Sequence, residues 1–156
     1  MRQVCCAGVL VVLLAACGGS SDVSSHAIVL DHSLGSVRLL EKKSDVDRAL
    51  GKGATLHNDQ HYGHEVRYSE GLDVFYAPGP KHQEVAFAVM TTSRRYRTRS
   101  GVGVGSSQTA VESLDGVHCY GPTQCQHGAA GQGEPGTAFA IRDGKVWRVA
   151  IATDFG

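Results

Sequence analysis

Three histidines lie within eight residues of one another in the first half of the chain: His57, His61 and His64, with Asp59 among them. Imidazole and carboxylate groups are the ligands from which zinc and copper sites are built. The residues between them are polar and include Gly63, which favours an exposed connection with solvated imidazoles. We therefore predict no resident metal or other cofactor, and keep metal binding by these histidines as an alternative.

The cysteines form a second group with distinctive chemistry. They are Cys5, Cys6, Cys17, Cys119 and Cys125. Cys119 and Cys125 flank a short run that contains glycine and proline, and in an oxidising compartment such a pair most simply closes a disulfide over a tight turn. A loop this short stabilises the fold by only about 2 kcal/mol. A zinc site that adds His118 and His127 is the alternative, although its ligands are crowded.

One local block of positive charge follows residue 93. It consists of Arg94, Arg95, Arg97 and Arg99, with Tyr96 among them. Guanidinium groups bind phosphates and carboxylates through paired hydrogen bonds. These arginines are thus candidate contacts for an anion or an acidic partner, although a solvated connector is the simpler interpretation.

No spacing of residues identifies a catalytic centre. The chain lacks a Gly-x-Ser-x-Gly elbow, and neither a Ser–His–Asp triad nor a pair of catalytic carboxylates is indicated. The glycine-rich run 101–107 lacks the third glycine and the preceding apolar strand of a dinucleotide site, so we interpret it as a connector. We predict a protein that is not an enzyme, with an enzyme of unrecognised site as an alternative.

The first sixteen residues have the pattern of a secretion signal. Arg2 is followed by an apolar run over residues 4–14 and then by two alanines. This run is too short to span a bilayer, which takes roughly 20 apolar residues. Residues 1–16 are therefore predicted to be a signal peptide and residues 17–25, rich in glycine and serine, a flexible tether.

The segment Leu14-Ala15-Ala16-Cys17 resembles the lipobox of bacterial lipoprotein precursors. The resemblance implies that Cys17 receives a diacylglyceryl group and becomes the lipidated N-terminus. It implies an exported protein that its acyl chains anchor to the cell membrane or the outer membrane, with the domain outside the cytoplasm.

Charge and length narrow the possible binding partners and the number of domains. The chain has 15 basic and 15 acidic side chains, and removal of the signal takes away Arg2 alone. This balance provides no basic footprint for nucleic acid and no electrostatic adhesion to anionic lipid. Membrane attachment is therefore assigned to the lipid on Cys17. Residues 26–156 suit one domain.

Two stretches predict short helices. In the first, Val46, Ala49 and Leu50 form one apolar stripe that ends at Gly51. In the second, residues 105–116 offer serine caps, an apolar pair and a glycine stop.

Alternating apolar segments follow each predicted helix. They are residues 64–68, 72–76 and 84–90 in the first half, and a hairpin around 119–125 with runs 137–142 and 145–152 in the second. Asp143-Gly144 between the last two runs predicts a type I′ turn. We therefore predict an α+β fold of two tandem copies, about 26–92 and 100–156, each a short helix followed by a three-stranded antiparallel meander.

The spacing of glycines and apolar residues in these units carries a further resemblance. The matching positions are Gly35, Val46, Leu50 and Gly51 in the first copy, and Gly105, Val111, Leu114 and Gly116 in the second. The pattern resembles small outer-membrane assembly lipoproteins and tandem β-lactamase-inhibitor proteins, and also uncharacterised lipoproteins of high-GC Gram-positive bacteria. It implies a non-catalytic protein-binding or envelope-assembly module that presents a sheet face or the groove between repeats to a protein partner.

Overall fold

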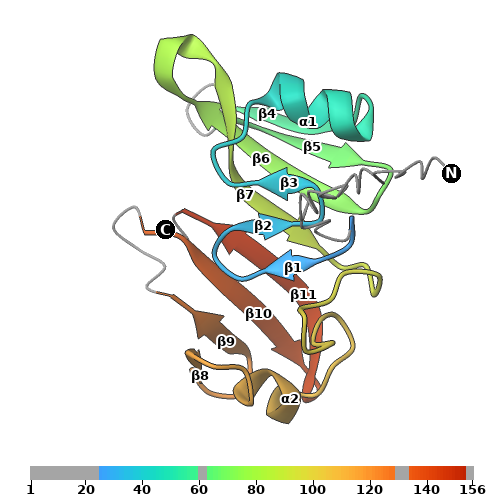
Figure 1. The fold of residues 1–156 in the computed structure, drawn as a ribbon, viewed down its shortest axis with the longest axis vertical. Helices are drawn as coiled ribbons and strands as arrows, with labels where there is room; N and C mark the ends of the chain where they lie inside the picture. The colour runs from blue at the N-terminus through green and yellow to red at the C-terminus, as the bar shows by residue number, and fades with distance from the viewer. Residues whose placement is uncertain (1–24, 60–62, 129–133, 154–156) are drawn as a thin grey trace, which may run out of the picture.

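Eight antiparallel strands form the main sheet, in the order β4-β5-β6-β7-β11-β10-β9-β8 (Figure 1). The computed structural model describes residues 25–59, 63–128 and 134–153. The strands are β4 (Ala54–Asp59), β5 (Gly63–Tyr68), β6 (Leu72–Pro78), β7 (Glu84–Thr91), β8 (Val117–Cys119), β9 (Gln124–His127), β10 (Gly136–Arg142) and β11 (Lys145–Ala152). Strands β7 and β11, which are far apart in the sequence, pair at the centre of the sheet and join its two halves.

One face of this sheet carries the remaining elements (Figure 1). They are a small sheet of β1 (Ile28–Val29), β2 (Ser33–Leu34) and β3 (Val37–Arg38), and the helices α1 (Lys43–Leu50) and α2 (Gln108–Glu112). Their apolar side chains pack into a single core with the inward side chains of the large sheet. The 3₁₀ turn η1 (Pro80–His82) lies in the hairpin between β6 and β7 and buries no residue.

The predicted α+β class, with two tandem copies of a helix and a three-stranded meander, is wrong. The protein is mostly β: α1 has eight residues and α2 five, whereas four strands follow each helix. Each set of four continues into the other through β7 and β11, so the chain has one large sheet, together with a small second sheet, instead of two separate meanders.

The first half contains a strand that the sequence analysis missed. The sequence does not predict strand β4, because its composition is largely polar and the pattern of residues 57–64 indicates a connection. As an edge strand, β4 pairs only with β5 and needs no continuous apolar run. His57 therefore belongs to β4, and His64 belongs to β5.

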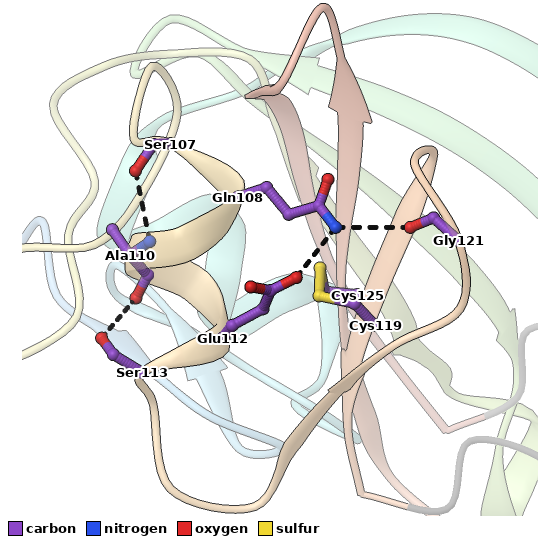
Figure 2. The surroundings of a disulfide bond; sticks show 8 residues. All are labelled: Ser107, Gln108, Ala110, Glu112, Ser113, Cys119, Gly121 and Cys125. Carbon is purple, nitrogen blue, oxygen red and sulfur yellow. Dashed lines mark hydrogen bonds between the residues drawn. A yellow bond between two sulfur atoms is a disulfide. The ribbon is translucent and has the colours of Figure 1, made fainter.

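The predictions that depend on local backbone chemistry are confirmed. Helix α1 buries Val46 and ends at Gly51, whose φ of 79° is left-handed. Helix α2 begins after Ser107, whose Oγ accepts a hydrogen bond from the amide of Ala110 at 3.2 Å (Figure 2).

Candidate functional site

The face of the large sheet opposite the helices is the candidate functional site. Side chains alternate between the two faces of a strand. On β11, Val149 and Ile151 point into the core and are fully buried, so Ala150 between them points to the other face. Ala150 is paired with Met90 of β7, and both therefore line the helix-free face.

The centre of this face is a shallow groove with a floor of small side chains, which we call the sheet groove. Its volume is about 210 Å³. The lining residues are Met90, Gln124, Ala138, Ala140, Arg148 and Ala150. They come from β7, β9, β10 and β11, so the sheet groove crosses the seam between the two halves of the sheet.

A β-bulge interrupts each of the two central strands and places an aromatic side chain on the helix-free face. Phe87 is the extra residue of β7, and its ring packs against Phe75 with centroids 6.2 Å apart. Trp147 is the extra residue of β11. Bulges reorient side chains in this way. The register of β7 and β11 puts these aromatic residues at opposite ends of the central pair, about 20 Å apart at roughly 3.3 Å per residue.

Two arginines contact the ring of Trp147. The guanidinium carbon of Arg142 lies 4.4 Å from the indole centroid, and that of Arg148 lies 4.6 Å from it. We call these three residues the Arg–Trp–Arg cluster. It lines a second hollow of about 610 Å³ that shares Gln124, Ala140 and Arg148 with the sheet groove. The two hollows therefore lie side by side on the same face.

The charges on this face are paired in one half and unpaired in the other. Arg67 donates hydrogen bonds to both carboxylate oxygens of Asp73, at 2.6 and 2.8 Å, and these bonds raise the pKa of the guanidinium. Within the described residues, the guanidinium groups of Arg142 and Arg148 make no hydrogen bond and no ion pair. The second half of the face therefore presents guanidinium groups that have no ion-pair partner.

The densest polar network lies on the other face, where it attaches α1 to the sheet. Asp47 accepts hydrogen bonds from Lys43 at 2.5 Å and from the Tyr68 hydroxyl at 2.7 Å. The Tyr68 hydroxyl also lies 2.7 Å from that of Tyr76. Burial raises the pKa of Tyr68, and it raises the pKa of Tyr76 to about 12. Both hydroxyls are therefore protonated at neutral pH and act as structural hydrogen-bond donors.

The three histidines of the predicted cluster are not brought together within the described residues. His57 lies in β4, and His61 falls outside the described part of the chain. The Nδ1 atom of His64 is 2.7 Å from Glu84, and its ring packs on Tyr76. In the described part of the chain, no group of three His, Cys, Asp or Glu side chains is placed to hold a metal ion.

The predicted disulfide between Cys119 and Cys125 is confirmed. It joins β8 to β9 beside α2, as Figure 2 shows. Gln108 of α2 donates hydrogen bonds to Glu112 and to the carbonyl of Gly121 in the hairpin turn, at 2.9 and 3.4 Å. The bridge and this side chain therefore hold one hairpin against the helix.

A zinc site built on these cysteines is contradicted, because both sulfur atoms belong to the disulfide. One of its predicted imidazoles has another partner as well. His127 lies 2.6 Å from Asp31, whose other carboxylate oxygen accepts a hydrogen bond from Thr137 at 2.8 Å. These contacts attach the small sheet to the large one.

The arginine block lies outside the helix-free face, in the connector between the two halves. Arg97 donates hydrogen bonds to the carbonyls of Tyr96 and Val104, at 3.3 and 2.8 Å, and so supports the connector. The other three, Arg94, Arg95 and Arg99, are exposed.

Sequence analysis did not identify the Arg–Trp–Arg cluster. The sequence contains a signal for it. Trp147, the single tryptophan of the chain, is followed directly by Arg148, and Arg142 lies on the other side of the predicted two-residue turn. The Asp143-Gly144 turn forms as predicted, with φ angles of 51° and 69°. It returns the chain so that Arg142 and Arg148 reach the same ring.

No family model matches the chain, and neither a curated protein nor a solved structure does. Within residues 25–59, 63–128 and 134–153, no helix combines the length and apolar character needed to cross a membrane.

Proposed function

We propose that the protein is a non-catalytic binding module that uses the helix-free face of its large sheet to hold a protein partner. The observation that carries this proposal is the sheet groove, where alanine side chains and Met90 form an accessible apolar floor between Phe87 and Trp147. Apolar floors with aromatic and arginine anchors are typical of protein interfaces.

The partner we propose is a protein that presents an acidic segment. Charge complementarity supports this choice, because neither Arg142 nor Arg148 forms an ion pair among the described residues, whereas Arg67 is paired with Asp73. Small floor residues let a backbone approach the sheet closely, and the 20 Å between Phe87 and Trp147 accommodates about six extended residues.

We further propose that a lipid on Cys17 holds this module at the membrane of an exported compartment. The support is the apolar run that ends in the lipobox-like segment Leu14–Cys17. In cells, Cys17→Ala should abolish incorporation of labelled fatty acid and release the protein from the detergent-soluble membrane fraction. Retained label in the variant contradicts this part of the proposal.

The binding face can be tested by photo-crosslinking in living cells. A photoreactive amino acid in place of Met90 samples the sheet groove, and one in place of Thr109, exposed on α2, samples the helix side. We expect a discrete adduct from the first position alone. The partner, identified by mass spectrometry, should then bind the purified full chain directly.

A charge placed in the groove provides the control for specificity. Ala138→Glu should eliminate the adduct from position 90, because it places a carboxylate on the apolar floor and repels the acidic segment. Thr109→Glu makes the same charge change on the helix side and should leave the adduct intact. Equal adducts in the two variants, with both proteins folded, exclude the sheet groove as the binding face.

A further inference from the structure

We propose that the Arg–Trp–Arg cluster is a carboxylate-binding subsite that recognises glutamate or aspartate side chains of an extended acidic peptide segment. This inference rests on the proposed function, because it assigns a chemical class to the segment that lies along the sheet groove. The cluster comprises Arg142, Trp147 and Arg148.

The geometry of the cluster leaves both guanidinium groups available for a ligand. Trp147 is half-buried at the bulge of β11, and its ring gives each arginine a flat surface at 4.4 and 4.6 Å. Stacking on an aromatic face occupies the plane of a guanidinium but leaves the N–H groups at its edge free. A carboxylate accepts two such N–H groups at once.

The local electrostatics favour an anion at this place. Two guanidinium groups held near one ring place positive potential on this part of the surface, which attracts an anion. Asp143 is the single carboxylate among the lining residues, and it is exposed in the hairpin turn without an ion pair to either arginine. The lining thus carries a net positive charge of one.

The neighbouring surface favours a peptide over a polyanion such as nucleic acid or polyphosphate. Ala138, Ala140 and Ala150 continue from the cluster as an apolar floor, which offers nothing to a second phosphate. A polyanion site needs a row of basic groups, whereas the chain as a whole is balanced at 15 basic and 15 acidic side chains. A segment with apolar side chains along the groove and acidic side chains at the end that meets the cluster matches this surface.

Trp147 supplies a direct readout, because it is the single tryptophan of the chain. The full chain, purified in a mild detergent, is titrated with a capped ten-residue peptide that has glutamates at one end and alanines and leucines along the rest. Separate titrations use the same peptide with lysine in place of glutamate, and inorganic polyphosphate. We expect a saturable change in tryptophan emission with the acidic peptide alone, confirmed by calorimetry.

Substitutions then locate the binding group. Arg142→Gln and Arg148→Gln should each weaken the acidic peptide about tenfold, the effect of one charge-assisted hydrogen bond. Arg95→Gln and Arg99→Gln remove the same charge from exposed positions in the connector, and should change the affinity less than about twofold. Calorimetry reports these affinities independently of fluorescence.

Several results would overturn the inference. They are the absence of a saturable change with the acidic peptide, equal binding of the lysine peptide, unchanged affinity in both arginine variants, and tighter binding of polyphosphate. The two proposals also fail separately. If Ala138→Glu eliminates the crosslinked partner while Arg142→Gln leaves its affinity unchanged, the sheet groove remains the binding face but the carboxylate subsite is wrong.

Discussion

The order of hydrogen bonds in the tyrosine network predicts unequal effects of removing its two hydroxyl groups. Tyr68 donates its single proton to Asp47 at 2.7 Å, so the bond between the tyrosines at 2.7 Å must be donated by Tyr76. Tyr68→Phe therefore removes a hydrogen bond to a charged group and also leaves the buried Tyr76 hydroxyl without an acceptor. Tyr76→Phe removes one neutral hydrogen bond and leaves the bond to Asp47 intact.

These differences translate into free energies of unfolding. A hydrogen bond to a charged group contributes roughly 1.5–3 kcal/mol, and a neutral one about 1 kcal/mol. We expect Tyr68→Phe to lower the free energy of unfolding by about 2–3 kcal/mol, and Tyr76→Phe by about 1 kcal/mol. The double variant leaves neither hydroxyl unpaired, so its loss should be about 1 kcal/mol smaller than the sum of the single losses.

Urea unfolding of the full chain in mild detergent, followed by circular dichroism, measures the free energies of unfolding of the two single variants and the double variant. Its pH dependence provides a second check. Although burial opposes ionisation, hydrogen bonds from Lys43 and Tyr68 lower the pKa of Asp47 below its ordinary value of 3.8. The stabilisation is thus complete above pH 3.8 and is lost as the pH falls through the lower folded-state pKa. Additive losses, or a larger loss in Tyr76→Phe, would refute the proposed order of donors.

Three further predictions test other parts of the structure. Gly63→Ala should destabilise the fold far more than Gly144→Ala in comparative thermal unfolding. Both glycines have positive φ, but of the two only Gly63 has no room for a Cβ, which would collide with the backbone carbonyl of Tyr76. Reducing the disulfide should lower the free energy of unfolding by about 2 kcal/mol, and alkylation of the denatured oxidised protein should find no free thiol at its two positions. Calorimetry with Zn²⁺ or Cu²⁺ should detect no site tighter than about micromolar, because no three His, Cys, Asp or Glu side chains of the described residues are placed to hold an ion and His64 is already paired with Glu84. A nanomolar site that His61→Ala removes would establish the metal-binding alternative.

The amino-acid sequence by itself determined those features that depend on a few neighbouring residues. The apolar stripe that ends at Gly51 predicts α1, and the serine at position 107 predicts the start of α2. Asp143-Gly144 predicts a turn with two positive φ angles, and the two cysteines that flank a short turn predict the disulfide. Each of these follows from backbone preferences or covalent chemistry within a few residues of the chain.

Only the tertiary structure decided how the strands combine and which face is open. The pairing of β7 with β11 joins segments separated by more than fifty residues, and β4 is a polar edge strand that depends on β5. The bulge at Trp147 places its ring beside Arg142 and Arg148 only after β10 and β11 have paired in their final register. Register and bulges depend on partner strands, so no local pattern specifies the sheet groove or the Arg–Trp–Arg cluster.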